Sequence, residues 1–286
     1  MHNTSGIRMR QHTLQAPCTF SGKGLHTGKP VTMRVLPAPA GTGIVFCRTD
    51  LGPEALVPAR VACVTQARRS TTLSQGGVKV VTPEHLLSAC YGLGVDNARV
   101  DLDAPEVPIL DGSAKPYADA FLSCGLAEQD ASRDWLVVTK PFVYEDARSD
   151  SRITFEPAET PSFTVTVDYH SEVLGVQEAR FEAGTDYARE IAPCRTFCFF
   201  HEIELLLKLG LIKGGSLDNA LVIDEPKGYL GGKTPFFPNE PARHKLLDLL
   251  GDFALAGEPI LGRVTAWKPG HKVNTQALKQ FLETTI

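Results

Sequence analysis

Two stretches of this chain share one pattern: a strand, a Pro-Ala turn and a second strand. They read VLPAPAGTGIVF at 35–46 and FEPAETPSFTVTV at 155–167, and their Pro-Ala pairs begin 120 residues apart, at Pro37 and Pro157. A pattern repeated at such a distance indicates a duplicated unit. The 286 residues are enough for two domains of ordinary size, each with its own core. The repeat therefore predicts two similar domains.

Both halves contain short β-rich runs separated by turn signals, and helices interrupt these runs. In the first half, Thr82 and Ser113 are expected to cap helices through EHLLSACYGL and KPYADAFLSC. In the second half, helices are expected at 200–209, 240–256 and near 275–284. Because a regular strand–helix alternation is missing, the pattern predicts the α+β class rather than a doubly wound sheet. The expected strands are VTMRVLPAP, GIVFCR, NARVDL, WLVVTKPFVYE, SRITFEPAE, SFTVTVDYH, NALVID and GRVTAW.

A polar segment, AEQDASRD at 127–134, separates the two halves. Polar connections of this kind are where domain boundaries usually fall. We therefore expect a first domain at 1–127 and a second at 134–286.

Charge and cysteine usage exclude several classes of protein. With 29 basic and 33 acidic residues, the formal charge is -4, so the chain lacks the basic excess of a nucleic-acid-binding protein. The seven cysteines form no CxxC pair and are odd in number, which rules out a complete disulfide framework and favours a reducing cytoplasm. The N-terminal sequence has no apolar signal-peptide core, and no stretch approaches the roughly 18 apolar residues of a membrane span.

The helix expected at 240–256 combines many leucines with polar residues one turn apart. Asn239 is expected to cap it, and Pro241 falls in the first turn, where a missing N–H costs nothing. His244 and Asp248 are four residues apart, so their Cβ atoms lie roughly 5–6 Å apart on one face, close enough to bind one metal ion. On spacing alone, an ordinary His-Asp pair on a solvated face is the alternative.

Three further segments carry residues suited to hydrolysis. Glu84 and His85 begin a helix, where one could bind a metal ion while the other handles a proton. Two histidines and one aspartate, His85, His244 and Asp248, would make three ligands and leave a fourth zinc position for water. His271 follows a Pro-Gly turn and is expected in a loop that presents its imidazole to a cleft. The hydroxyl of Thr196 could serve an oxyanion. Taken singly, a first-turn Glu-His pair, a loop histidine and a core threonine are all ordinary features.

Seven segments, taken together, resemble one enzyme family. Their order and approximate spacing are similar to those of the UDP-3-O-acyl-N-acetylglucosamine deacetylases, zinc amidohydrolases that commit the precursor to lipid A in Gram-negative bacteria. The resemblance runs from about residue 12 to 282, and PNEPARHKLLDLLGD is also similar to deacetylases fused to a 3-hydroxyacyl carrier-protein dehydratase. The segments are TFSGKGLHTGKP, TPEHLLSACYGLGVDN, PILDGSAKPYADAF, CRTF, GGSLDNALVI, NEPARHKLLDLLGD and PGHKVN.

The resemblance implies a role for each residue that matches a family motif. In EHLL, His85 corresponds to a zinc ligand and Glu84 to the general base. In RHKLLD, His244 and Asp248 correspond to the other two ligands. His271 in PGHKVN corresponds to the general acid that protonates the departing amine.

Five more residues match positions around the reaction centre. The resemblance implies that Thr196 steadies the tetrahedral intermediate and that Asp252 orients His271. It implies that Lys245 and Lys268 contact charged or polar parts of the substrate. Phe197 corresponds to an aromatic residue near the sugar and the acyl chain.

The family fold implies two similar two-layer α/β sandwich domains with their helices packed between the sheets. An insertion at about 196–225 is expected to form an apolar passage for the fatty acyl chain. One Zn²⁺ per chain is expected, with Fe²⁺ as the alternative metal, in a monomer that makes at most peripheral contact with the inner membrane. Two other functions stay open: a zinc amidohydrolase for another N-acyl sugar or nucleotide, and a non-catalytic lipid or nucleotide-sugar binding protein.

Overall fold

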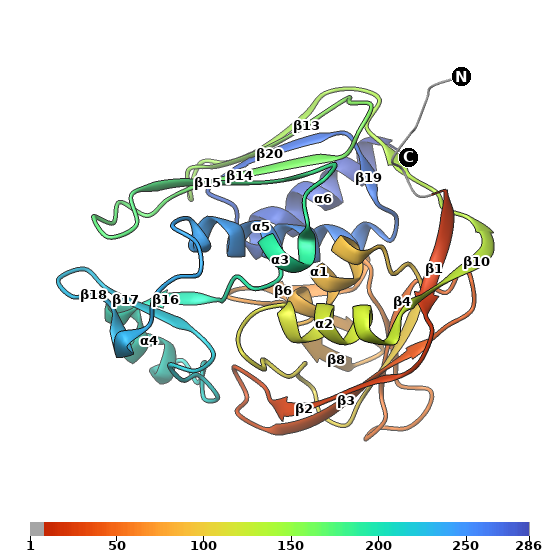
Figure 1. The fold of residues 1–286 in the computed structure, drawn as a ribbon, viewed down its shortest axis with the longest axis horizontal. Helices are drawn as coiled ribbons and strands as arrows, with labels where there is room; N and C mark the ends of the chain where they lie inside the picture. Colours follow the sequence, from red (N-terminus) through yellow and green to blue (C-terminus); the bar gives the residue numbers. More distant parts are fainter. Residues whose placement is uncertain (1–8, 286) are drawn as a thin grey trace.

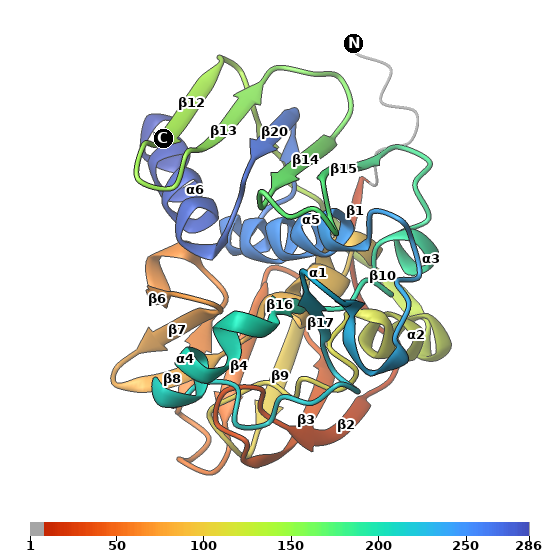
Figure 2. The same ribbon diagram turned by 90° about the vertical axis from the view of Figure 1, so that its left-hand side faces the viewer.

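The computed structural model describes residues 9–285 and contains two five-stranded sheets with helices packed between them (Figure 1). The view in Figure 2, turned by 90°, shows the same three layers, with α5 and α1 between the sheets. The first sheet has the order β2-β3-β9-β4-β5 and comprises Cys18–Lys23, Pro30–Pro37, Ala98–Leu102, Ile44–Arg48 and Leu56–Pro58. The second has the order β12-β13-β20-β14-β15 and comprises Phe142–Asp146, Ser151–Glu156, Arg263–Trp267, Ser162–Asp168 and Val176–Glu182. The helices are α1 (Glu84–Leu93), α2 (Lys115–Cys124), α3 (Tyr187–Glu190), α4 (Ile203–Lys208), α5 (Glu240–Phe253) and α6 (His271–Thr285).

The two sheets have the same topology. Each contains one parallel pair, β4 with β9 or β14 with β20, and its other neighbouring strands are antiparallel. The Pro-Ala pairs occupy equivalent places, because Pro37 ends β3 and Pro157 directly follows β13. The duplicated unit, the α+β class and the helices between the sheets are therefore confirmed.

Strands in which buried and exposed side chains alternate supply the apolar faces that cover the helices. In β13 and β14 every second side chain is buried, as expected when one face of a pleated sheet packs on a core. Phe155 of β13 stacks on Phe253 of α5, at 5.5 Å between ring centroids, and on Phe281 of α6, at 4.3 Å. These rings hold α5 and α6 in place beneath the second sheet.

Smaller sheets lie outside the two main ones. The segment predicted as a polar connection is instead largely a strand, β10, which pairs with β1; its polar alternation reflects a ribbon with exposed side chains rather than irregular backbone. The domain boundaries at 127 and 134 stay a prediction. The strands are β1 (Arg10–Leu14) with β10 (Leu126–Ser132), β11 (Leu136–Val137) with β19 (Ile260–Leu261), β6 (Val64–Ala67) with β7 (Thr71–Gln75) and β8 (Val78–Val81), and β16 (Phe197–Phe199) with β17 (Leu221–Asp224) and β18 (Gly228–Tyr229).

Two predicted helix starts are wrong. Thr82 does not cap α1: its φ is +57°, Pro83 is the N-cap residue, and the Thr82 hydroxyl donates to Glu106 at 3.1 Å. The last helix begins at His271 rather than near 275, so this histidine lies in a helical turn and not in a loop. A helix end holds a side chain more firmly than a loop does, which suits a group that must keep one orientation.

The other two caps are closer to expectation. Asn239 is the N-cap residue of α5, although its side-chain oxygen accepts from Arg243 instead of from the first turn. Ser113 stands one residue before the N-cap of α2, and its hydroxyl accepts from the backbone N–H of Lys115 at 3.1 Å. Among residues 9–285, no helix is both long enough and apolar enough to cross a membrane.

The helices α1 and α5 approach each other closely at Gly251. A Cβ atom at this position would lie 2.1 Å from the carbonyl oxygen of Glu84 and 2.8 Å from its carbonyl carbon. Only glycine allows the backbone of α5 to lie against the first turn of α1. This contact brings the start of α1 beside the polar face of α5.

We expect Gly251→Ala to destabilise the protein, although alanine is the better helix former by about 1 kcal/mol. The added methyl group meets backbone atoms, which cannot move aside as a flexible side chain can, so the free energy of unfolding should fall by about 1–3 kcal/mol. Urea unfolding measures the change. Gly270→Ala is the control because a Cβ there meets no atom within 4 Å; equal stability of both variants would contradict the close approach.

Candidate active site

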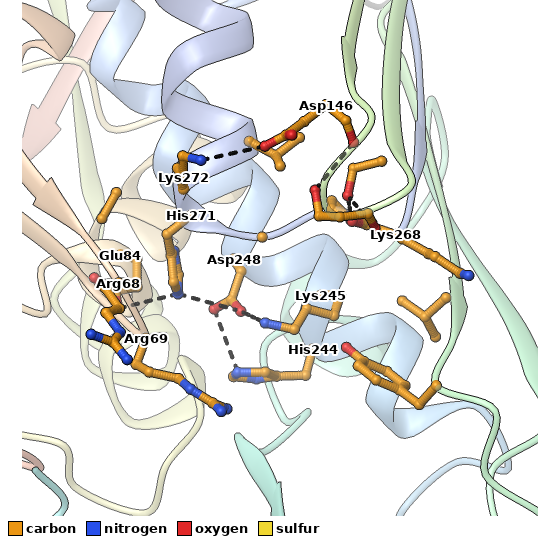
Figure 3. A pocket seen from close by; sticks show the side chains of 18 of the residues that line it. Arg68, Arg69, Glu84, Asp146, His244, Lys245, Asp248, Lys268, His271 and Lys272 are labelled. Atoms are coloured by element: carbon orange, nitrogen blue, oxygen red, sulfur yellow. Dashed lines mark hydrogen bonds and ion pairs between the residues drawn. The ribbon is translucent and has the colours of Figure 1, made fainter. Parts of the chain in front are cut away.

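A pocket of about 1010 Å³ opens between the two halves of the molecule. Its lining includes Glu84 and His85 from α1, Lys245 from α5 and the first residue of α6, His271. Figure 3 shows the side chains of Glu84, Lys245 and His271 converging from different elements. The pocket thus brings together residues that the sequence spreads over nearly 190 positions, from 84 to 271.

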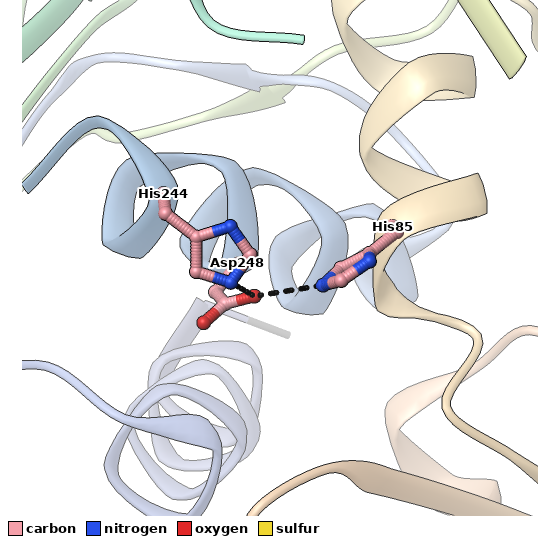
Figure 4. A group of neighbouring side chains, drawn as sticks. All are labelled: His85, His244 and Asp248. Carbon is pink, nitrogen blue, oxygen red and sulfur yellow. Dashed lines mark ion pairs between the residues drawn. The ribbon is translucent and has the colours of Figure 1, made fainter. Parts of the chain in front are cut away.

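Two histidines and one aspartate form a compact group in this pocket (Figure 4). Oδ1 of Asp248 lies 3.4 Å from Nε2 of His244 and 3.6 Å from Nε2 of His85, and one ligand atom from each residue lies within 4.8 Å of the others. All three side chains are buried. Tetrahedral zinc, with bonds of about 2.0–2.2 Å, separates its ligand atoms by roughly 3.3–3.6 Å, so the two spacings from Asp248 to the histidines fit one ion.

The protonation of His244 supports a cation at this point. Its Nδ1 lies 3.0 Å from the carbonyl oxygen of Cys194, which can only accept, so Nδ1 carries the proton and Nε2 presents a lone pair. Burial lowers the pKa of His244 to about 3, which keeps the ring neutral. Its lone pair therefore faces Oδ1 of Asp248, a buried oxygen that receives no hydrogen bond from residues 9–285. Two acceptors facing each other at 3.4 Å are satisfied when a cation lies between them.

Lys245 prepares the other oxygen of Asp248. Its Nζ donates to Oδ2 at 2.8 Å. Burial opposes ionisation of the Asp248 carboxyl, but the positive charges of Lys245 and His271 outweigh it and hold its pKa well below the usual range. Asp248 is therefore an anion at neutral pH, with Oδ2 fixed and Oδ1 free to bind a metal ion.

Glu84 lies beside the His85–His244–Asp248 group, and the pKa of the Glu84 carboxyl is unusual. Its side chain is 2% exposed, and burial raises its pKa to about 7 despite the opposing charge of His271. Oε1 of Glu84 lies 3.6 Å from Nε2 of His271. A carboxylate that titrates near neutral pH can take a proton from water and release it again.

His271 is held as a cation by the carboxylates around it. Its Nδ1 donates to Oδ2 of Asp252 at 2.9 Å, and its Nε2 faces Glu84 and Asp248. Burial would lower the pKa of His271, but Asp252, Glu84 and Asp248 outweigh it and raise the pKa to about 10. The predicted contact between Asp252 and His271 is therefore present, and Nε2 is left to deliver a proton.

The remaining predicted residues lie around this centre. Thr196 and Phe197 line the pocket, and the Phe197 ring packs edge-on against His244 at 6.2 Å between centroids. Lys268 also lines the pocket, where its Nζ donates to Asp150 at 3.0 Å. Four residues outside the predicted set add cationic side chains to the same lining: Arg68, Arg69, Arg148 and Lys272.

A buried ion pair behind the site was not predicted. Glu240, which is fully buried, accepts from both the backbone N–H and the side-chain Nε of Arg195, each at 2.9 Å. Glu240 lies one turn before His244, and Arg195 directly precedes Thr196. The pair therefore fixes Thr196 relative to α5, which carries His244 and Asp248. Both residues fall in CRTF and NEPARHKLLD, but no local spacing signals that they meet.

The chain matches the model of one known family, and the match includes the residues on both sides of this pocket. The family model, LpxC, UDP-3-O-acyl N-acetylglycosamine deacetylase, matches residues 11–283. The chain belongs to this family. LpxC deacetylases act on an N-acetyl amide and depend on a metal ion, and His85, His244 and Asp248 form a group that could hold one.

Curated relatives agree with the LpxC family match. A UDP-3-O-acyl-N-acetylglucosamine deacetylase of Myxococcus xanthus is 42% identical over 273 residues, covering 95% of this chain and 86% of the relative. A bifunctional enzyme LpxC/FabZ of Chlorobaculum tepidum is 41% identical over 299 residues, covering 96% of this chain. The chain spans 64% of the length of that relative, and 63% of a bifunctional LpxC/FabZ enzyme of Porphyromonas gingivalis. The expected resemblance to fused deacetylases is therefore confirmed.

Proposed function

We propose that this chain hydrolyses the N-acetyl group of UDP-3-O-[(3R)-3-hydroxyacyl]-N-acetylglucosamine, giving the free amine and acetate in lipid A biosynthesis. The observation that carries the proposal is the buried His85–His244–Asp248 group with Glu84 and His271 directly beside it. These five residues are the parts that a metal-assisted amide hydrolysis needs.

We propose Zn²⁺ as the metal ion, because two neutral imidazoles and one carboxylate are typical ligands of a catalytic zinc site with an open position. Fe²⁺ is the alternative for the same donors. When bound, the ion polarises the amide carbonyl and lowers the pKa of the attacking water. His85, His244 and Asp248 hold it.

Glu84 and His271 divide the proton transfers between them. Glu84 acts as the general base and takes the proton of the attacking water, which its pKa of about 7 permits. His271, protonated and oriented by Asp252, gives a proton from Nε2 to the departing amine. The amine then leaves as a neutral group instead of as an unstable anion.

The substrate is assigned to the pocket by charge and polarity. Lys245 and Lys268 are proposed to contact the charged and polar parts of the UDP-sugar, since ammonium groups attract phosphate. Thr196 is proposed to donate its hydroxyl to the oxyanion, and Phe197 to pack near the sugar and the acyl chain. The acyl passage is proposed for the insertion at about 196–225, which begins with the pocket-lining Thr196. The insertion contains β16, α4 and β17 and projects away from the two main sheets (Figure 1).

We also propose that the protein works in the cytoplasm as a monomer, with at most peripheral contact with the inner membrane. All seven cysteines are free thiols, which suits a reducing compartment. The two units at 1–127 and 134–286 are proposed as its domains, each contributing one side of the pocket.

Acetate release from UDP-3-O-(3-hydroxyacyl)-N-acetylglucosamine tests the proposal directly. The protein is assayed as purified, after treatment with a chelator, and after Zn²⁺ is added back. Release that stops with the chelator and returns with Zn²⁺ supports the substrate and the metal together. A folded, zinc-loaded protein that releases no acetate from this substrate contradicts the proposed activity.

The pH dependence of kcat/KM is expected to be bell-shaped. Activity rises as Glu84 loses its proton and falls as His271 loses its own, and these groups have pKa values of about 7 and about 10 before a metal ion binds. The positive charge of the metal ion favours the deprotonated forms, so both limbs should lie below these values. Rates measured from about pH 5 to about pH 10 check this; a single ionisation across that range would refute the two-group assignment.

A further inference from the structure

Thr71 contacts both Glu84 and Asp252, the residue that orients His271, but it does not line the pocket. It begins β7 in the first half of the molecule and is 1% exposed. Its backbone N–H donates to Oε2 of Glu84 at 3.3 Å, and its hydroxyl donates to Oδ1 of Asp252 at 2.6 Å. Its carbonyl oxygen accepts from the N–H of Thr82, two residues before Glu84.

The hydroxyl contact fixes the carboxylate that orients His271. Asp252 is fully buried, and its Oδ2 accepts from Nδ1 of His271 at 2.9 Å and from the side-chain amide of Asn274 at 2.8 Å. Among the side chains of the described residues, Thr71 is the donor to Oδ1. Without that hydroxyl, one oxygen of a buried carboxylate has no side-chain donor, and the carboxylate can rotate about its Cβ–Cγ bond.

The same residue joins helices from the two halves of the chain. Glu84 and Thr71 belong to the first half of the chain, whereas Asp252 and His271 belong to α5 and α6 in the second. A shift between the halves would change the distance between base and acid, and the two hydrogen bonds of Thr71 oppose such a shift. The short strand β7 is held on both sides by β6 and β8, so it is a firm support for them.

We propose that Thr71 is the positioning residue that sets the general base and the general acid relative to each other. The inference rests on the proposed deacetylase function and adds to it a residue that does not contact the substrate. Because Thr71 lies outside the pocket lining, its hydroxyl affects the chemical step and not the affinity for the substrate.

Thr71→Val tests the hydroxyl alone, since valine has a similar shape, keeps the backbone N–H and is favourable in a strand. The zinc-loaded variant is expected to lose about 10- to 100-fold in kcat, with KM within about twofold of the unchanged protein and with its bound zinc retained. Thr71→Ser, which restores the hydroxyl, is expected to recover kcat to within about threefold. Thr72→Val is the matched control, because Thr72 is the next residue of β7, is also buried, and among the described residues has no side-chain hydrogen bond to Glu84 or Asp252.

Three results would overturn the proposal: an unchanged kcat in Thr71→Val, an equal loss in Thr72→Val, or a loss that Thr71→Ser does not recover. If valine prevents folding, Thr71→Ala removes the same hydroxyl without added bulk and is judged by the same standard against Thr71→Ser. Failure of this inference is separate from failure of the proposed function. In the first case the unchanged protein releases acetate and the hydroxyl proves irrelevant, whereas in the second the unchanged protein releases none.

Discussion

His244→Ala is expected to abolish both metal binding and acetate release. The imidazole supplies one of the three donor atoms, and the Cys194 carbonyl oxygen, 3.0 Å from Nδ1, fixes the orientation of its ring; alanine has no donor atom in its place. Loss of a hydrogen-bond partner behind a metal ligand typically costs 10- to 100-fold in metal affinity or activity, so loss of a ligand itself should cost more than about 100-fold. Metal content measured by mass spectrometry and acetate release measured in the same sample check both parts.

A histidine outside the pocket supplies the control. His12 lies on β1, where its Nδ1 contacts the carbonyl oxygen of Arg10 at 3.0 Å, and His12→Ala should keep its zinc and its activity. If His244→Ala retained a full equivalent of zinc and normal turnover, the His85–His244–Asp248 group could not be the metal site.

The fold could be predicted where its signals are local. The two Pro-Ala turns and the β-rich runs around them are signalled by neighbouring residues. They predicted two similar units, which the repeated sheet topology confirms. The prediction failed where distant contacts decide the structure. The segment 127–134 is polar because one face of β10 is exposed, and it is a strand only because β1, more than a hundred residues earlier, pairs with it. Thr82 is a residue type that often caps helices, but its hydroxyl donates a hydrogen bond to Glu106 instead.

The site divides in the same way. His244 and Asp248 could be paired from the sequence because i and i+4 share a helix face. Glu84, His85 and His271 were candidates from their local sequence, and the resemblance to a family gave each of them its role. That His85 completes this group, and that Glu84 lies 3.6 Å from His271, depends on how α1, α5 and α6 pack. Supporting contacts such as Thr71 with Asp252, which are 181 residues apart, leave no local trace in the sequence.

Glu84→Gln is expected to retain the metal ion and lose most of the activity. Glutamine has nearly the same shape as glutamate but cannot accept a proton from water, and removal of a general base typically lowers the rate by about 10²- to 10⁴-fold. The expected loss is in kcat, with zinc content unchanged because Glu84 is not in the ligand group. Acetate release and metal content, measured together, distinguish this result from that of His244→Ala; an active Glu84→Gln enzyme would remove Glu84 from its role.

The same substitution should stabilise the metal-free protein, and the effect should depend on pH. Burial raises the pKa of Glu84 from 4.5 to about 7, so the folded protein holds this proton more tightly than the unfolded chain does. Below pH 4.5 both states are protonated and ionisation costs nothing. Between pH 4.5 and about 7 the unfolded chain ionises first, and the free energy of unfolding falls by an amount on the order of 3 kcal/mol. Above that range Glu84 is ionised in the folded protein as well, and the free energy of unfolding falls no further.

A glutamine does not ionise, so this cost disappears in Glu84→Gln. In urea unfolding of the metal-free proteins, the variant should be as stable as the unchanged protein near pH 4 and more stable near pH 8, by a difference on the order of 3 kcal/mol. Glu159→Gln makes the same chemical change at an exposed position and is the control. A variant that is no more stable at pH 8 than at pH 4, relative to the unchanged protein, would mean that burial of Glu84 is not costly. If Glu84→Gln gains stability and loses turnover, the buried carboxylate lowers the stability of the fold and is present because the reaction needs a base there.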